Sequence, residues 1–184
     1  MGKAPMIRVS KLNAARRQLD CAIELWFADK DKVSVHTLAA AAHQIIHDIN
    51  QKKGGKELLF DSAKIKDEHR SDWISILKNA MNFFKHADKD AEEILEFTPA
   101  TSEMFMLFSI MGLESIGETT NDTEYTFFLW FSIHNPDLLT KTYRKIMEEL
   151  APVGYLDEIR NISKGEFFET VMRGRGELRY KGPF

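Results

Sequence analysis

Apolar residues recur at steps of three and four along most of the chain, which is the periodicity of amphipathic helices. The clearest run predicts a helix from Ser10 to about Ala28, and the Ser10 hydroxyl can cap its first turn. We find no convincing run in which apolar and polar residues alternate as they do in a half-buried strand. The pattern therefore predicts an all-α protein, a bundle of about five to seven helices.

The same periodicity predicts further helices, separated by polar or glycine-rich breaks. Their expected ranges are 34–50, 67–87, a segment after residue 101 or 102, a segment after residue 121 or 122, and 136–150, with an ordered loop or single turn over 56–66 and a short turn over 155–162. Thr101 or Ser102 is expected to cap the fourth helix. Asn121 or Asp122 is expected to cap the fifth. Pro136 suits the first turn of the sixth.

Two of these helices have compositions that bear on packing. The second contains the run Ala39–Ala42, whose small side chains let another helix approach closely, although alanine is also the best helix former. The fifth contains an aromatic group that spans more than half of its circumference, Phe127, Phe128, Trp130 and Phe131. These rings are expected in the core or at a subunit interface, where aromatic residues are enriched.

Length and composition favour one globular domain. The chain has 184 residues, of which 43% are hydrophobic and 29% charged, as is typical of a protein with a packed core. We place a helical domain at 10–172, between an N-terminal tail at 1–9 and a C-terminal tail at 173–184. Because the C-terminal tail combines glycines with basic residues, we expect it to be flexible. The alternative is a small arm that binds nucleic acid through its cations and Tyr180.

Composition also excludes several classes of protein. The net charge of −3 gives no general attraction to nucleic acids or acidic membranes. The single cysteine, Cys21, excludes an internal disulfide and any thiolate cluster for zinc or iron–sulfur chemistry. The most apolar stretch, 104–116, is interrupted by polar residues and glycine, so it cannot span a membrane. The N-terminus lacks an apolar signal segment. We therefore expect a cytoplasmic protein without membrane contact and without a cofactor.

Three histidines of the second predicted helix, His36, His43 and His47, fall on one line along its surface. The main apolar arc, which includes Ala39 and Ile46, lies elsewhere on the helix, so we expect the histidines to border or oppose the apolar face. His43 and His47 are four residues apart, a spacing at which two imidazoles can bind one metal ion. No Glu-x-x-His or His-Glu-x-x-His motif accompanies them. The alternative is that the histidines are exposed or hydrogen-bonded to a neighbouring helix.

A polar pair, Asn82 and His86, projects from the end of the third predicted helix. The two residues are four apart and therefore share one face of an otherwise apolar helix. Lys85 lies between them, where the helix macrodipole favours a cationic side chain. The pairing of an amide with an imidazole indicates a functional site.

In this segment the chain resembles the HEPN families, small helical dimers in which an Arg, often followed by Asn, precedes a His by little more than one helical turn. Asn82 and His86 match that pattern, whereas Met81 stands at the position of the Arg and Lys78 lies one turn earlier. The resemblance implies metal-independent cleavage of RNA by a site that two subunits complete. In that chemistry the His transfers a proton at a ribose hydroxyl and the Arg holds phosphate.

The missing Arg leads to our preferred hypothesis. It is a non-enzymatic or catalytically degenerate HEPN-like homodimer that binds a ligand or partner near the two histidine-bearing helices, with RNA or a nucleotide among the possible ligands. His36, His43 and Lys85 are the candidate ligand-binding residues.

Two alternatives remain open. The first is a metal-independent RNase in which Asn82 and His86 are the catalytic residues. The second, from a different class, is a metal-binding helical bundle in which His43 and His47 are the ligands.

Overall fold

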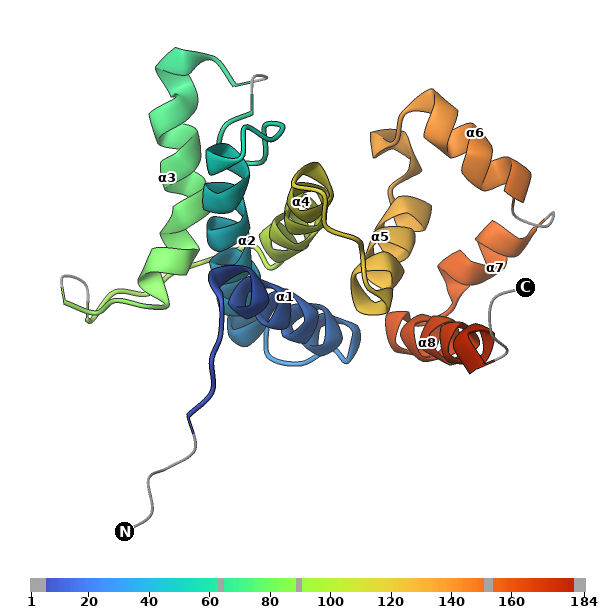
Figure 1. The fold of residues 1–184 in the computed structure, drawn as a ribbon. Helices are drawn as coiled ribbons and strands as arrows, with labels where there is room; N and C mark the ends of the chain where they lie inside the picture. The colour runs from blue at the N-terminus through green and yellow to red at the C-terminus, as the bar shows by residue number, and fades with distance from the viewer. Residues whose placement is uncertain (1–5, 63–64, 89–90, 151–153, 181–184) are drawn as a thin grey trace, which may run out of the picture.

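The computed structural model describes residues 6–62, 65–88, 91–150 and 154–180. These residues form helices and no strand, which confirms the predicted all-α bundle. The α-helices are α1 (Lys11–Phe27), α2 (Lys32–Lys52), α3 (Asp67–Phe83), α4 (Ala100–Ser115), α5 (Asp122–His134), α6 (Lys141–Leu150), α7 (Tyr155–Asn161) and α8 (Lys164–Tyr180), and a 3-10 helix lies at Pro136–Leu138 (Figure 1). No helix within these ranges is long and apolar enough to cross a lipid bilayer.

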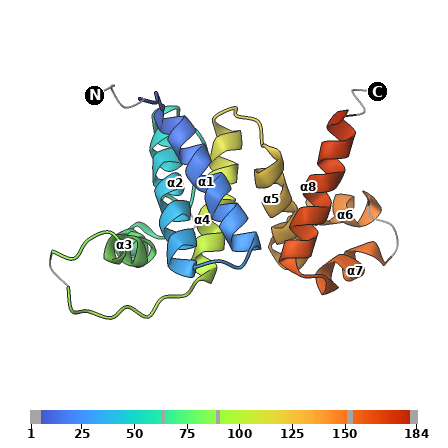
Figure 2. The same ribbon diagram turned by 90° about the horizontal axis from the view of Figure 1, so that it is seen from below.

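Helix α2 lies at the centre of the N-terminal half, with α1 and α4 packed against it and α3 on a further side (Figures 1 and 2). Within the run Ala39–Ala42, Ala39, Ala40 and Ala42 are fully buried, so small side chains do face neighbouring elements here. Gly112 of α4 lies directly against α2. A β-carbon added to Gly112 would be 2.6 Å from Cγ2 of Ile46, so only glycine fits this contact without a shift.

A second set of contacts joins α1, α5 and α8 through aromatic rings. Phe127 of α5 is fully buried, and its ring centroid lies 5.4 Å from that of Trp26 in α1. Trp130, also in α5, contacts Phe167 of α8 at 5.1 Å between centroids. Phe127 and Trp130 therefore pack against rings of the same chain. This agrees with the expectation that the rings of the fifth helix lie in the core.

Two predicted helix caps are confirmed. The Ser10 hydroxyl accepts the N–H of Asn13 at 3.1 Å at the start of α1. At the start of α5, the side-chain oxygen of Asn121 accepts the N–H of Glu124 at 2.9 Å, and the Glu124 carboxylate accepts the N–H of Asn121 at 2.8 Å. This reciprocal pair is a capping box, which satisfies two otherwise unpaired donors of the first turn.

The predicted cap of α4 is wrong. The helix begins at Ala100, directly after Pro99, and no side chain caps it. The Thr101 hydroxyl donates instead to the carbonyl of Thr98 at 2.8 Å. Ser102 is buried, with its Oγ 3.0 Å from Nδ1 of His36. The Ser102 hydroxyl, one of the two expected to cap α4, thus contacts α2 instead.

Two helix boundaries also differ from the periodicity. The N–H groups of both Lys85 and His86 donate to the carbonyl of Asn82, so the chain turns and α3 ends earlier than expected. The single helix predicted from Pro136 is divided into the 3-10 helix and α6, because Leu139 has an extended backbone. The short turn expected over 155–162 corresponds to α7.

Helix α8 replaces most of the expected C-terminal tail. It continues to Tyr180, so the segment 173–184, expected to be a flexible tail, is helical as far as 180, with 181–184 outside the described residues. Arg175 Nε lies 2.6 Å from Oδ1 of Asp122, and its guanidinium is 4.3 Å from the ring centroid of Tyr125. This cation is therefore paired within the chain instead of being presented to nucleic acid.

Replacing Gly112 with alanine is expected to lower the free energy of unfolding by about 1–3 kcal/mol, because the added β-carbon overlaps Ile46 and Leu58. Gly174→Ala is the matched control. Gly174 lies in α8 with no atom within 4 Å of an added β-carbon, so alanine is expected to stabilise by up to about 1 kcal/mol. Chemical denaturation measures both effects. A Gly112→Ala variant as stable as Gly174→Ala would contradict the tight contact.

Candidate functional site

The three histidines of α2 are buried, which corrects our expectation that they border or oppose the apolar face. The exposed fractions of His36, His43 and His47 are 1%, 0% and 7%. From residue 35 to residue 50 only Asp48 is exposed, because α1, α3, α4 and the loop 56–62 surround the helix. The face of α2 that carries the histidines is therefore also covered by neighbouring elements.

His43 is held between aromatic rings. Its ring centroid lies 4.8 Å from that of Phe60 and 5.4 Å from that of Phe105. Neither ring nitrogen has a hydrogen-bond partner among the described residues. Burial, and to a smaller extent the neighbouring His47, lowers the pKa of His43 to about 3. The ring is therefore neutral at pH 7 and contributes to packing.

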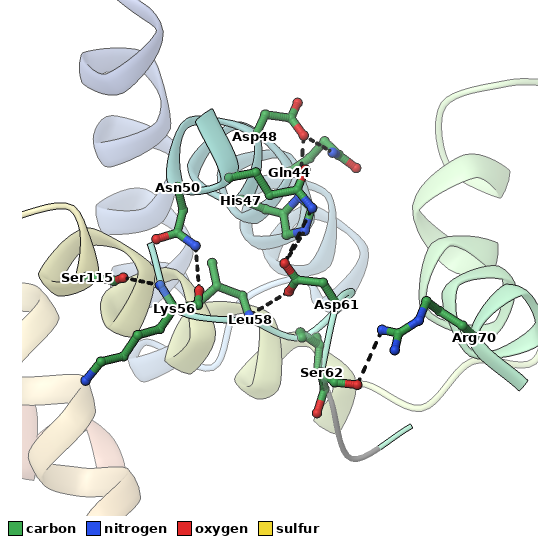
Figure 3. Close-up of polar contacts among 12 residues, drawn as sticks. Gln44, His47, Asp48, Asn50, Lys56, Leu58, Asp61, Ser62, Arg70 and Ser115 are labelled. Atoms are coloured by element: carbon green, nitrogen blue, oxygen red, sulfur yellow. Dashed lines mark hydrogen bonds and ion pairs between the residues drawn. The ribbon is translucent and has the colours of Figure 1, made fainter. Parts of the chain in front are cut away.

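The loop 56–62 that covers His43 is ordered, as expected (Figure 3). The side-chain amide of Asn50 donates to the carbonyl of Lys56 at 2.6 Å, and the N–H of Lys56 donates to the Ser115 hydroxyl at 2.8 Å. These bonds fasten the loop to both α2 and α4. Its apolar run, residues 58–60, is buried as a result.

Asp61 closes this loop onto α2. Its Oδ1 accepts the N–H of Leu58 at 2.6 Å, and its Oδ2 lies 3.5 Å from Nε2 of His47 (Figure 3). The rings of His43 and His47, our candidate metal ligands, have centroids 6.1 Å apart. Among the described residues no group of three or more His, Cys, Asp or Glu side chains is placed to hold a metal ion. The metal-binding hypothesis therefore gains no support from this geometry.

His36 has one polar partner and one unpaired nitrogen. Its Nδ1 lies 3.0 Å from Oγ of Ser102 in α4, which is the hydrogen bond to a neighbouring helix that we considered. Its Nε2 is buried and has no partner among the described residues. Three phenyl rings contact the imidazole edge-on, those of Phe84, Phe97 and Phe105. Burial, followed by the charge of the exposed Lys85, lowers the pKa of His36 to about 4.

Asn82 and His86 come together at a pocket beside the end of α3. We call it the α3 pocket; its volume is about 500 Å³. The walls are formed by Asn79, Asn82, Phe83, His86, Asp88, Glu93, Ile94 and Leu95. Both members of the predicted pair are exposed and line this one pocket, and Asn79 adds a second amide one turn earlier.

The α3 pocket is acidic. Asp88 and Glu93 contribute carboxylates, and no Lys or Arg occurs among the described residues that line it. Met81, at the position of the HEPN arginine, is buried, and Lys85 is not part of the wall. The described part of the wall therefore holds no cation for a phosphate group.

A smaller pocket of about 200 Å³ adjoins the α3 pocket and shares Asn79 and Leu95 with it. We call it the His36 pocket; its other walls are His36, Ile76, Leu77, Ala80, Glu96, Phe97, Thr98 and Thr101. The structure thus brings His36 into the region of Asn82 and His86. His43 and His47 line neither of these two pockets.

Helical periodicity does not predict the pocket residues that come from the segment between α3 and α4, such as Glu93 and Leu95. This segment has neither helix nor strand between residues 93 and 98, where it runs past the end of α3 toward α4 (Figure 1). The sequence could have placed Asn79 at this site, because Asn79 lies three residues before Asn82 and shares its helical face.

The buried histidines are expected to make stability depend on pH. Because the folded-state pKa of His43, about 3, lies below the unfolded value of 6.5, the unfolded chain binds the proton first as pH falls. The stability is complete above pH 6.5 and is lost progressively toward pH 3. Below about pH 6 the native chain should therefore lose about 1.4 kcal/mol per pH unit relative to His43→Leu.

Urea unfolding between about pH 7 and pH 5 measures this difference. The matched control is His69→Leu, since His69 is an exposed histidine of α3. That variant is expected to follow the pH dependence of the native chain. Identical slopes for the native chain and His43→Leu would contradict a neutral, buried His43.

No protein-family model, curated protein or solved structure matches this chain. The likeness to the HEPN families therefore rests on the segment 81–86, and function has to be inferred from the chain's own geometry. That geometry places His36, Asn82 and His86 around two adjoining pockets.

Proposed function

We propose that this chain is a non-catalytic, HEPN-like helical protein that binds a small ligand carrying an amine in the α3 pocket. The composition of the pocket wall carries the proposal: two carboxylates, two amides and His86, with no Lys or Arg among the described lining residues. Its volume of about 500 Å³ lies within the range of small-molecule sites. The homodimer implied by the HEPN resemblance is part of the same proposal.

Electrostatics favours a cation in this pocket. Asp88 and Glu93 both line the pocket, so a cation there is attracted by both. Each carboxylate is exposed, and one such ion pair contributes about 0.2–1 kcal/mol. The amides of Asn79 and Asn82 supply donors and acceptors for further polar groups. The same carboxylates repel phosphate, which argues against RNA or a nucleotide.

The remaining walls favour an apolar body attached to the amine. The side chain of Ile94 is 94% exposed, so a ligand that covers it removes apolar surface from water, worth roughly 25 cal/mol per Å². Phe83 adds an aromatic ring over which an ammonium group can bind. An amine with an aromatic or aliphatic body meets both kinds of wall.

A metal-independent RNase is the second candidate function. The observation in its favour is that Asn82 and His86, the pair matched to the HEPN motif, line one pocket. His86 would move the proton at the ribose hydroxyl. The described wall holds no cation for the phosphate, and in this candidate function a partner subunit supplies one. We rank binding above catalysis for this reason.

Benzylammonium is expected to bind the native chain more tightly than benzyl alcohol, because only the ammonium is attracted by the two carboxylates. Glu93→Gln should weaken benzylammonium binding by up to about fivefold, the worth of one exposed ion pair. Glu92→Gln removes an adjacent exposed carboxylate outside the pocket wall and is the matched control. Titrations followed by NMR give the dissociation constants. Equal affinities for the two probes would reject the amine-binding proposal.

An RNA cleavage assay separates the two candidate functions. We expect the native chain to leave single-stranded RNA intact. Cleavage that disappears in His86→Ala and persists in the exposed control variant His69→Ala would replace the binding proposal with the RNase.

A further inference from the structure

We infer that the His36 pocket is a separate binding site for a small uncharged ring bearing one hydrogen-bonding group, with that group bonded to Nε2 of His36. The inference does not depend on the amine proposed for the α3 pocket. It combines an unpaired buried nitrogen, an apolar wall and the charges around the pocket.

The nitrogen is the first observation. His36 is 1% exposed, its Nδ1 faces the Ser102 hydroxyl at 3.0 Å, and its Nε2 has no partner among the described residues. Native proteins leave few buried polar atoms without a partner, since each one is destabilising. His36 is one of the residues that line the pocket, so a ligand bound there lies beside this side chain.

The wall is the second observation. Leu77 and Ala80 come from α3, and Leu95 and Phe97 come from the returning segment. The ring of Phe97 contacts His36 edge-on with 5.5 Å between centroids. Such surroundings favour a flat apolar body with a single polar group. A volume of about 200 Å³ is below the range of sites for drug-sized ligands, so the site suits one ring.

The charges favour an uncharged ligand. Glu96 lies in the wall and repels an anion, while the apolar residues do not compensate an ammonium group for its lost water. Lys85, whose charge acts on His36, is exposed and not part of the wall. Because burial lowers the pKa of His36 to about 4, its imidazole is neutral at pH 7. Nε2 of a neutral imidazole is a hydrogen-bond donor in one tautomer and an acceptor in the other. It can therefore donate to a ligand hydroxyl or accept from it.

Phenol and toluene are the probes that test this site, because they share a ring and a similar size and only phenol has a hydroxyl. Phenol is expected to bind the full chain about two- to tenfold more tightly than toluene, the range of one net hydrogen bond. In protein whose histidines are labelled with ¹⁵N, phenol should shift the Nε2 resonance of His36. The resonances of the equally buried His43 should stay unchanged.

Two variants localise the effect. His36→Phe is expected to abolish the preference for phenol, whereas His43→Phe, at a buried position outside the pocket wall, retains it. Because a variant of His36 can fail to fold, Ala80→Leu provides a second test: it fills the pocket from the side of α3 and should abolish binding of both probes.

Three results would each overturn the inference: equal affinities of the native chain for phenol and toluene, a phenol-induced shift at a histidine other than His36, or unchanged binding in Ala80→Leu. Glu93→Gln, which tests the α3 pocket, is expected to leave phenol binding unchanged. Failure of the amine proposal and failure of this one are therefore distinguishable.

Discussion

The close contact between α2 and α4 is the constraint on which the rest of the structure depends. Gly112 leaves no room for a side chain against Ile46 and Leu58. The small residues of the run Ala39–Ala42 let other elements approach α2 at the same time. Because α2 is covered on several faces, the side chains on those faces are buried, whether they are apolar or polar. Three histidines consequently become core residues, and the low pKa values of two of them follow from that burial.

Helix α3 is held less firmly than the helices around α2, and the two pockets form beside it. Leu77 and Met81 are its buried residues, and the indole N–H of Trp73 donates to the carbonyl of Leu59 in the loop that covers α2, at 2.8 Å. On its other side the chain returns without regular structure. Because this segment does not pack as a helix would, the two pockets remain between it and the core. Polar residues line both of them.

The helices were largely predictable from the sequence because helical periodicity is local, whereas burial and pockets depend on distant segments. The shared face of Asn82 and His86 follows from a spacing of four, but Glu93 reaches the same pocket through a segment with no period to detect. The glycines and charges after residue 172 are typical of a tail. Their helix is anchored by the pairing of Arg175 with Asp122, a contact between residues far apart in the chain.

The environments of the histidines also decide what chemistry each can support. A general base works best when its pKa is near the working pH, and burial takes His36 far below neutral, so its imidazole is suited to a hydrogen bond and not to proton transfer. His86 is exposed, yet Asp88 and Glu93 share its pocket. Phosphoryl chemistry needs fixed positive charge where negative charge develops, and carboxylates have the opposite effect. These environments are why our proposal assigns binding, and not catalysis, to the two pockets.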